Sequence, residues 1–428
     1  MSARTTATTT RAAAGPTTRR CRLCGAPLEH TFVDLGMSPP CEAYVTSDRL
    51  DEGEMFFPLH VRVCDQCLLV QLPAYVPPEN IFSDYAYFSS FSDSWVAHAE
   101  AFVGQAVERL GLGPDSFVVE VASNDGYLLQ HVVARGIRCL GIEPAGNVAQ
   151  AAVERGVSTV VAFLGQGTGS AVAAEHGPAD LVVANNVFAH VPDIVDFAKG
   201  LRALLADDGR VTIEIPHLLR LIEGNEYDTI YHEHFSYLTL LTTQRVLAAA
   251  GLTVVDVEEL SSHGGSLRTW SAPTESAPPP SAEVARVLAL EAAAGLDTVA
   301  GHDGFAAQVA RVRDDFVTFL QAAEREGRTV VAYGAPGKGN TLLNHAGVRS
   351  DLLRFMVDRN PYKQGRFTPG THIPIYPPDA LDAARPDYVV VMPWNLRAEI
   401  SAQLAHVAEW GGKLVVALPR LEVFEPGT

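Results

Sequence analysis

The stretch "FVVEVASNDGY", residues 117–127, decides the fold of the central part of the chain. Its first residues have the apolar, β-branched character of a short buried strand, and Ser, Asn, Asp and Gly follow as turn formers. Residues 127–136 then show the helical spacing of apolar side chains and end at a glycine. A strand, a tight turn and a helix in this order are typical of the first unit of a parallel sheet covered by helices.

The alternation of strands and helices continues on the C-terminal side of this unit. After the last helix, two strands follow one another without a crossover helix between them. This order predicts an α/β fold, a doubly wound parallel sheet with an antiparallel finish, as in the Rossmann-like domain of class I methyltransferases. The predicted strands are 138–144, 158–164, 179–190, 210–216, 252–260 and 265–273, and the predicted helices are 145–156, 193–209 and 242–251.

The turn after the first strand lacks the G-x-G-x-x-G pattern that holds a pyrophosphate. Glu143 ends the second strand, where a carboxylate can accept hydrogen bonds from both ribose hydroxyls. Adenosine without phosphates fits best, so S-adenosylmethionine is the predicted cofactor. Each feature alone has another interpretation: the turn residues can form an ordinary turn, and the carboxylate of Glu143 can simply be solvated. The predicted cofactor-binding residues are Glu120, Ser123, Asn124, Asp125, Gly126, Glu143, Phe163 and Asn185, with Asn186 beside them for the substrate.

Four of the six cysteines form two C-x2-C pairs, "CRLC" at 21–24 and "CDQC" at 64–67. Two such pairs supply the four thiolates that tetrahedral zinc requires. A redox pair would need only one of them, and disulfides are rare in a chain of cytosolic character. The prediction is a structural zinc site, closed to substrate, made of Cys21, Cys24, Cys64 and Cys67. Cys41 and Cys139 are expected to be buried apolar residues.

A second α/β series begins after a Pro- and Ala-rich stretch and a helical segment at about 282–326. Its turn "YGAPGKGNTLL", residues 333–343, runs from strand into helix, where backbone amides and a lysine can hold phosphate. Lys338, Lys363 and Arg366 lie in loops of this series, although the chain has few lysines. They predict an anion site for a diphosphate-bearing substrate, with solvated loop charges as the alternative.

The overall charge argues against several classes of partner. A net charge of −18 and a pI near 5.2 disfavour nucleic acids and anionic membranes, because both require a basic face. No apolar run is long enough to cross a bilayer, so a cytoplasmic protein is expected, as a monomer or small homo-oligomer. Residues 1–20 are expected to form a disordered leader, with a transit peptide as the alternative.

The stretch "TIYHEHFSYLT", residues 229–239, follows the fifth strand at the carboxyl edge of the sheet, where substrate enters. His232 and His234 are two residues apart, so they do not share a helical face as in H-E-x-x-H zinc sites. A metal site on a strand and histidines without a special role remain alternatives. Acid and base chemistry is favoured, because imidazole titrates in the useful range and a neighbouring carboxylate raises its basicity.

Several motifs together resemble the sugar C-methyltransferases of deoxysugar pathways, of the tetronitrose and mycarose types. The resemblance covers residues 21 to about 420. It implies a zinc-binding domain at 21–90, a methyl-donor domain at 91–275 and a substrate-binding α/β domain at 276–428. The motifs are the two cysteine pairs, "IFSDYAYFSS", "ASNDG", "NNVFAHV", "YHEHFSY", "HGGSLR", "YGAPGKGNTLLN" and "DRNPYKQGRFTPGTHIPI".

The resemblance also implies the reaction, methyl transfer to a carbon beside the ketone of a dTDP-4-keto-6-deoxy sugar. By similarity, His234 is the base with Glu233 beside it, Tyr231, Tyr85 and His190 line the sugar site, and Asn344 joins the substrate-binding residues. Carbon 3 is the favoured position, and carbon 5 is possible because His232 stands where carbon-3 enzymes of the family carry Asp. An O- or N-methyltransferase and a non-catalytic binding module are the alternative functions.

Overall fold

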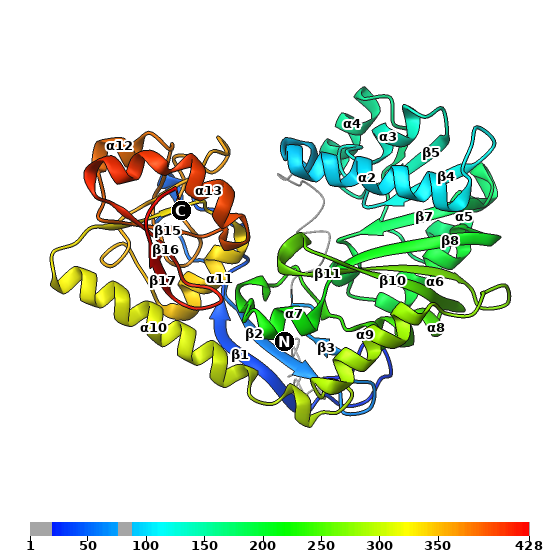
Figure 1. The fold of residues 1–428 in the computed structure, drawn as a ribbon, viewed down its shortest axis with the longest axis horizontal. Helices are drawn as coiled ribbons and strands as arrows, with labels where there is room; N and C mark the ends of the chain where they lie inside the picture. Colours follow the sequence, from blue (N-terminus) through cyan, green and yellow to red (C-terminus); the bar gives the residue numbers. More distant parts are fainter. Residues whose placement is uncertain (1–18, 76–87, 428) are drawn as a thin grey trace, which may run out of the picture.

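The computed structural model describes residues 19–75 and 88–427, which form three sheets (Figure 1). The largest has the strand order β10-β11-β8-β7-β4-β5-β6, and β11 runs antiparallel to both of its neighbours. The predicted parallel sheet with an antiparallel finish is therefore confirmed. Its strands are β4 (Phe117–Val121), β5 (Arg138–Ile142), β6 (Thr159–Val160), β7 (Ala179–Asn185), β8 (Leu205–Pro216), β10 (Leu252–Leu260) and β11 (Ser266–Pro273).

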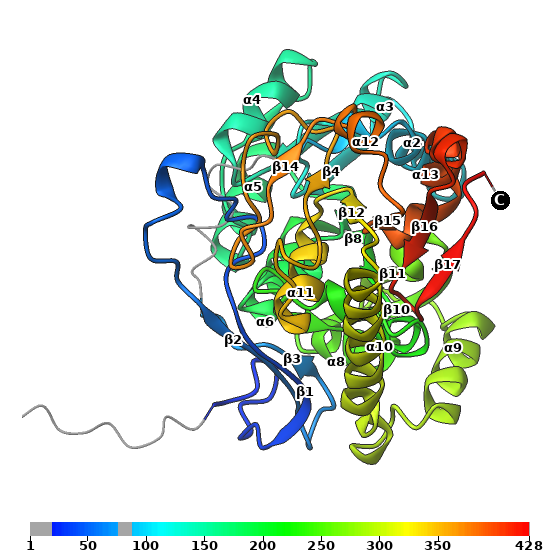
Figure 2. The same ribbon diagram turned by 90° about the vertical axis from the view of Figure 1, so that its left-hand side faces the viewer.

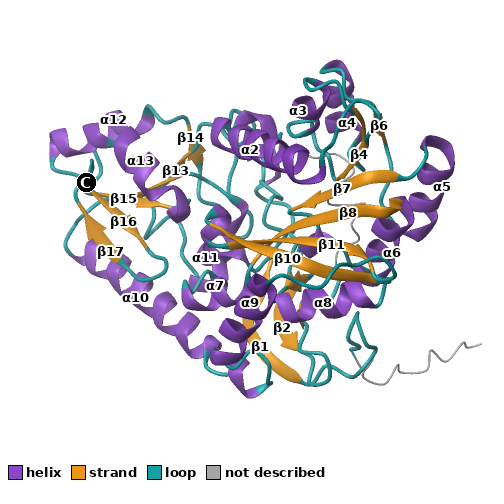
Figure 3. Ribbon diagram, turned by 45° about the vertical axis from the view of Figure 1, so that its right-hand side comes forward, coloured by secondary structure: helices purple, strands orange, loops and turns teal. Residues whose placement is uncertain are grey.

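Helices cover both faces of this central sheet (Figure 3). Three of them, α2, α5 and α7, are absent from the sequence-based prediction. Helix α5 was missed because its glycines are poor helix formers. A Cβ at Gly169 would lie 2.5 Å from the carbonyl oxygen of Gly200 in α6, so glycine at this position permits close packing of the two helices. The helices are α2 (Asp93–Leu110), α3 (Leu129–Val133), α4 (Gly146–Glu154), α5 (Gln166–His176), α6 (Ile194–Leu204), α7 (Leu218–Glu223) and α8 (Leu240–Ala248).

A small antiparallel sheet lies between the central sheet and the C-terminal sheet, at the bottom of Figure 1. Three of its strands come from the N-terminal part of the chain. The fourth, β9, comes from the stretch 229–239 and pairs with β3 through Val70–Tyr237 and Gln71–Ser236. Ser236 and Tyr237, from a stretch that sequence analysis placed in the central domain, are therefore part of the N-terminal sheet. The strands are β1 (His30–Ser38), β2 (Phe57–Val63), β3 (Val70–Gln71) and β9 (Ser236–Tyr237).

The C-terminal sheet has the order β14-β13-β12-β15-β16-β17 and is parallel except for β17. The predicted helical segment before it is two helices, because Gly295 and Gly304 adopt positive φ and break it. The strands are β12 (Val330–Tyr333), β13 (Met356–Val357), β14 (Ile375–Tyr376), β15 (Tyr388–Val391), β16 (Lys413–Val416) and β17 (Glu422–Phe424). The helices are α9 (Ala282–Ala293), α10 (Phe305–Arg325), α11 (Gly337–Ala346), α12 (Ala380–Ala384) and α13 (Arg397–Gln403).

The N-terminal sheet shares a hydrophobic core with the C-terminal unit. Figure 2 shows α10 and α11 beside β1, and the Phe32 ring of β1 stacks on Phe305 of α10 at 4.7 Å. A second core joins the cysteine pairs to the central sheet. Short 3-10 helices complete the chain: η1 (Ser47–Arg49), η2 (Ser89–Phe91), η3 (Phe188–His190), η4 (Tyr227–Thr229), η5 (Ser262–Gly264), η6 (Ala300–His302), η7 (Trp394–Leu396) and η8 (Ala405–Trp410). None of the helices in the described ranges is long and apolar enough to cross a membrane.

Candidate active site

The turn after β4 has an unusual backbone. Ala122, Asn124 and Gly126 have φ of 56°, 50° and 79°, so two residues with side chains adopt the left-handed conformation that glycine prefers. Conformations of this kind persist only where the surroundings impose them, and they cluster at functional sites. The turn that the sequence singles out is therefore held in a strained, defined shape at the carboxyl edge of the sheet.

Glu143, which follows β5, is oriented by this turn. Its carboxylate accepts hydrogen bonds from the backbone N–H of Asn124 and of Ala145, both at 2.9 Å. Burial raises the pKa of the carboxyl, although both backbone hydrogen bonds oppose the rise. Each carboxylate oxygen has a second lone pair, so Glu143 can also accept from two ribose hydroxyls.

Polar atoms without partners lie at the ends of β4 and β7. Among the described residues, no hydrogen-bond partner exists for Oε2 of Glu120, Oδ1 of Asn185 or either amide atom of Asn186, although all are buried. Buried polar atoms are almost always paired, so such a group is what a bound polar ligand would satisfy. These residues and Glu143 therefore fit the adenosine and amino-acid parts of S-adenosylmethionine.

The side chains of three other predicted cofactor residues are only partly engaged in the protein. Asn124 Oδ1 accepts from the backbone N–H of Ser89 at 2.8 Å, and Asp125 forms an ion pair with Arg155 at 2.8 Å. Ser123 points toward β5, where a Cβ on Gly141 would meet its Oγ. Oγ of Ser123 and Oδ1 of Asp125 have no hydrogen-bond partner among the described residues, so both can also meet a ligand, whereas the side chain of Asn124 supports the turn.

Two further predicted cofactor residues differ in exposure and in space. Phe163, just after β6, is 41% exposed, which leaves its ring free to cover an adenine. A Cβ at Gly126 would approach Cγ2 of Val157 to 3.0 Å, and its φ of 79° is costly for other residues. Glycine is thus required at the end of the turn.

His234 is the centre of the second part of the site. Its Nδ1 lies 2.7 Å from the carbonyl oxygen of Thr229, so Nδ1 carries the hydrogen. Burial and the neighbouring His190 hold the pKa of His234 well below its usual value, so the ring is neutral. Nε2 is then the free base, and it accepts from the hydroxyl of Tyr231 at 3.0 Å. Tyr231 is half-buried and His234 is 9% exposed, so the tyrosine lies nearer to solvent.

The structure brings His190 against His234, with ring centroids 4.6 Å apart in an edge-to-face arrangement. Burial lowers the pKa of His190 to about 4, and its ring is hydrogen-bonded to the backbone of Glu233. The next residue after His234 is held twice, because the N–H of Phe235 donates to Ala189 O at 2.8 Å and its carbonyl accepts from Leu72 N at 3.0 Å. Tyr85, the remaining predicted member, lies outside the described residues.

The neighbours of His234 point elsewhere. His232 Nε2 lies 3.3 Å from the carbonyl oxygen of Phe57 in β2, and burial lowers its pKa to about 4. Glu233 accepts from the thiol of Cys41 at 3.5 Å, and burial raises its pKa to about 7, with Glu42 adding to the rise. Four consecutive side chains therefore face at least three different surroundings, and Glu233 is not paired with the imidazole of His234.

Cys41 is the residue at this site that sequence analysis missed. It is buried as expected, at 3% exposed, but its thiol contacts Glu233 and its carbonyl accepts from Asn340 Nδ2 at 2.6 Å. No local spacing signals this contact, because Cys41 and Glu233 are far apart in the sequence. Cys139, also expected to be buried, is half-buried at the edge of the core around α2.

Lys363 is occupied within the C-terminal unit. Its ammonium donates to Ala335 O at 2.8 Å and lies 3.6 Å from Glu42. The same carbonyl accepts from the hydroxyl of Tyr44 at 2.5 Å, and the N–H of Ala335 donates to Asp358 at 2.7 Å. Protein groups of both signs therefore fill the turn before α11, where a phosphate was expected.

Of the other predicted anion-site residues, two already have protein partners and one does not. Lys338 donates to Oδ1 of Asn395, and Asn344 holds the carbonyl oxygens of Asn340 and Pro369 at 2.8 and 3.1 Å. Arg366 is half-buried, and its guanidinium makes no hydrogen bond or ion pair with any residue in 19–75 or 88–427. Of these residues, Arg366 has the cation that is free for a ligand.

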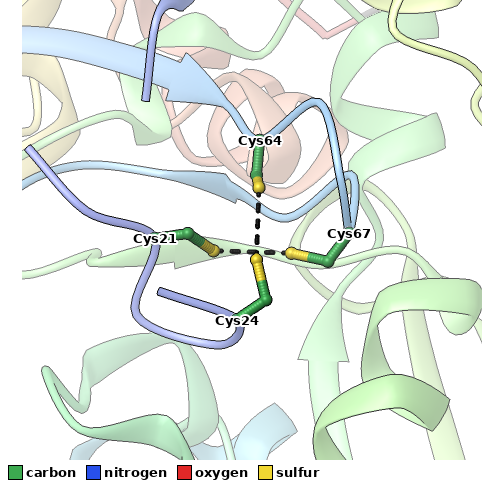
Figure 4. A group of neighbouring side chains, drawn as sticks. All are labelled: Cys21, Cys24, Cys64 and Cys67. Carbon is green, nitrogen blue, oxygen red and sulfur yellow. Dashed lines mark hydrogen bonds between the residues drawn. The ribbon is translucent and has the colours of Figure 1, made fainter. Parts of the chain in front are cut away.

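The four predicted zinc ligands are together. All four sulfurs lie within 4.8 Å of one another, with Cys21–Cys67 at 3.4 Å and Cys24–Cys64 at 3.5 Å (Figure 4). Zinc–sulfur bonds of about 2.3 Å in a tetrahedron place the sulfurs about 3.8 Å apart, so the group fits zinc. With four thiolates no coordination position is left for substrate.

Groups around the cysteines connect this zinc-binding group to the rest of the site. Gln71 Nε2 donates to the sulfur of Cys21 at 3.1 Å and its Oε1 accepts from Arg22 N at 2.9 Å. The guanidinium of Arg22 donates to Pro192 O at 3.0 Å and lies over the ring of Phe235 at 5.6 Å. One cysteine pair is thereby packed against residues that closely follow His190 and His234.

Comparisons with known proteins cover most of the chain. Residues 21–82 match the family described as a zinc binding domain, residues 95–257 a methyltransferase domain, and residues 261–419 a C-methyltransferase C-terminal domain. The C-methyltransferase NovU of Streptomyces niveus is 36% identical over 403 residues, which is 94% of this chain and 96% of that protein.

Solved structures show partial likeness to the chain. A SAM-dependent methyltransferase from Anabaena variabilis is 14% identical, covers 42% of this chain and 86% of its own, and has a TM-score of 0.35. The PH0226 protein of Pyrococcus horikoshii is 14% identical, covers 46% of this chain and 97% of its own, and has a TM-score of 0.36.

Proposed function

The chain belongs to the S-adenosylmethionine-dependent C-methyltransferases, and from this premise we propose that it methylates a dTDP-linked 4-keto-6-deoxy sugar in deoxysugar biosynthesis. The acceptor is the carbon beside the ketone. Carbon 3 is favoured, and carbon 5 is the second possibility because His232 stands at the position that departs from carbon-3 enzymes.

The observation that carries this proposal is the state of His234. A neutral imidazole with Nδ1–H fixed on Thr229 O presents Nε2 as a base, inside a site that excludes most solvent. A hydroxyl or an amine that is methylated also releases a proton, but its attacking lone pair exists beforehand, whereas the carbon beside a ketone becomes a nucleophile only after a base has removed its proton. A buried, oriented base is therefore most useful for methylation at carbon.

The same hydrogen bond supports a role for Tyr231. Its hydroxyl donates to Nε2 of His234, so it shields the base until a substrate arrives. When that hydroxyl turns to the ketone oxygen of the sugar, Nε2 is free to take the proton and the tyrosine stabilises the enolate. His190, whose ring is bonded to the backbone of Glu233, packs on the base and keeps it neutral.

Glu120, Glu143 and Asn185 would hold the donor at the edge of the sheet, and Asn186 beside them would meet the substrate. When bound, S-adenosylmethionine supplies the methyl group that the enolate carbon takes up. Arg366, with its unpaired guanidinium, would meet the diphosphate of the sugar nucleotide, assisted by Lys338 and Lys363 after exchange of their present partners.

The test is mass spectrometry of dTDP-4-keto-6-deoxy sugars incubated with the protein and S-adenosylmethionine. The expected product gains one methyl group that survives mild base, and fragmentation identifies the carbon. A panel of 2-deoxy and 3-amino variants narrows the sugar. No gain across the panel, with donor binding confirmed by calorimetry, would withdraw the sugar substrate.

A second measurement distinguishes methylation at carbon from the alternative, methylation of an oxygen or a nitrogen. With S-adenosylhomocysteine present, the protein should exchange the proton beside the ketone with deuterium from the solvent. A methylated product without such exchange would favour an O- or N-methyltransferase.

A further inference from the structure

The segment that precedes His234 is packed against the C-terminal unit. Asp228, in η4, is 1% exposed and accepts from the indole N–H of Trp394 in η7 at 2.8 Å. Trp394 comes from the loop after β15, far from Asp228 in the sequence. The hydrogen bond therefore joins the C-terminal sheet to the residue directly before Thr229.

A second contact lies on the other side of Thr229. The hydroxyl of Thr341 in α11 donates to the carbonyl oxygen of Ile230 at 3.0 Å, and Thr341 is 2% exposed. His345, one turn further along α11, packs edge-on against the ring of Tyr227 at 5.6 Å. The C-terminal unit thus holds the side chain of Asp228 before Thr229 and the backbone carbonyl of Ile230 after it.

From this arrangement we propose that Trp394 and Thr341 are positioning residues for the base. They fix the segment 227–230 and, through the carbonyl oxygen of Thr229, the orientation and tautomer of His234. The inference rests on the proposed role of His234 and adds to it that the C-terminal unit assembles the base as well as binding substrate. Neither side chain itself contacts His234.

The indole that makes this contact is itself held in place. The ammonium of Lys338 lies 4.5 Å from the centroid of the Trp394 ring, and it donates to the side chain of the next residue, Asn395. Loss of the indole N–H would remove a hydrogen bond to a buried carboxyl, which costs more than an exposed one. The segment is then expected to shift, and shifts of about 1 Å at a reacting group can cost about 100-fold in rate.

The decisive comparison is Trp394→Phe against Trp410→Phe. Trp410 also lies in the C-terminal unit, but its indole N–H donates to Pro386 O at 3.0 Å and not to a residue of η4. Solvent deuterium exchange beside the ketone, with S-adenosylhomocysteine bound, should slow about 10- to 100-fold in W394F and less than about threefold in W410F. Donor affinity should be equal in both. Equal exchange rates in the two variants would overturn the proposal.

Conservative variants separate positioning from general stability. Asp228→Asn keeps an oxygen that can accept from Trp394 and should lose at most a few-fold in exchange, whereas Asp228→Ala should lose as much as W394F. In the same way Thr341→Ser should retain activity and Thr341→Val should not. If Asn and Ala at position 228 behaved alike, the hydrogen bond would not be the cause.

A measurement without substrate keeps this inference distinct from the proposed function. In protein with 15N-labelled histidine, the Nδ1–H of His234 should give a slowly exchanging NMR signal that W394F shifts or broadens and W410F leaves in place. An unchanged signal in W394F would refute the positioning role even if the substrate were of another class. A changed signal with no exchange on any keto sugar would instead refute the proposed substrate.

Discussion

The chain contains two strand–turn–helix units with the same plan, one from β4 and one from β12. In each, an acidic residue ends the second strand, and its carboxylate accepts from the turn of the first strand and from the N–H two residues further on. Glu143 contacts Asn124 and Ala145 at 2.9 Å, and Asp358 contacts Ala335 and Asn360 at 2.7 Å. The two units nevertheless differ in what surrounds the turn.

Around the β4 turn, buried amide and carboxyl atoms remain unpaired among the described residues. Around the β12 turn, Tyr44, Lys363 and Asp358 already satisfy the backbone of Ala335. The same topology therefore gives a ligand site in one place and a structural joint in the other. The difference lies in the polar partners, because backbone groups that are already paired gain little from a ligand.

The largest expected effect is on turnover at the proposed base, His234, which packs against His190 after β7 of the central sheet. His234→Gln should reduce methyl transfer about 1,000-fold or more, because general-base catalysis contributes up to about 10⁴-fold. Single-turnover kinetics measure the loss, and calorimetry should show unchanged donor affinity. Retained turnover would mean that the base lies elsewhere in the molecule.

The next effect tests the two acidic residues against one another. Glu143→Ala should weaken S-adenosylmethionine about 100-fold, because two hydrogen bonds to an ionised group are lost. Asp358→Ala removes the equivalent carboxylate of the other unit and should leave donor affinity unchanged while lowering the melting temperature. Calorimetric titration measures both. Equal losses of donor affinity would show that the two turns are not functionally different.

A smaller effect is expected among the cations of the C-terminal unit. Arg366→Ala should raise KM for the sugar nucleotide about tenfold with little change in kcat, because its guanidinium is free for a diphosphate. Lys363→Ala should act mainly on stability, since its ammonium already holds Ala335 O and faces Glu42. Steady-state kinetics and thermal unfolding separate the two. A larger rise of KM in K363A would place the phosphate site at the β12 turn.

The smallest expected effect is a change in rate with pH. Because the pKa of His234 lies well below its ordinary value of about 6.5, its basic form persists on acidification, and kcat should vary less than about twofold between pH 6 and 7.5. An ordinary imidazole would lose about fourfold over that range. The pKa of Glu233 is raised to about 7, so Glu233 would also titrate in this range. The same pH profile is therefore measured in Glu233→Gln, which removes that titration. An inflection near 6.5 that remains in E233Q would contradict the buried base.

Much of the central fold could be predicted from sequence, because apolar strands alternate regularly with amphipathic helices. The four zinc ligands could also be predicted, because the spacing of the two C-x2-C pairs specifies the ligand set. Helix α5 was missed because glycine has a low helix propensity, and only the close approach of α6 explains why Gly169 is in a helix. A tertiary contact overrides the local preference there.

The candidate site was less predictable than the fold. The presence of His190, Tyr231 and His234 in one place is consistent with the sequence-based hypothesis, but the role of each side chain depends on which way it points. Nothing local indicates that His232 faces β2 or that Glu233 meets Cys41. Nor does the turn "GAPGKG" reveal that Tyr44 and Lys363 occupy it, because both partners are distant in the sequence.

The pairing of β3 with β9 has a consequence for synthesis of the chain. Val70 and Gln71 leave the ribosome long before Ser236 and Tyr237. Until then β3 is an unprotected edge, and unpaired edges are sites of intermolecular association. The N-terminal segment must wait for most of the central domain to be translated before its sheet is complete. Truncated products that end before residue 236 should therefore aggregate even when zinc is abundant.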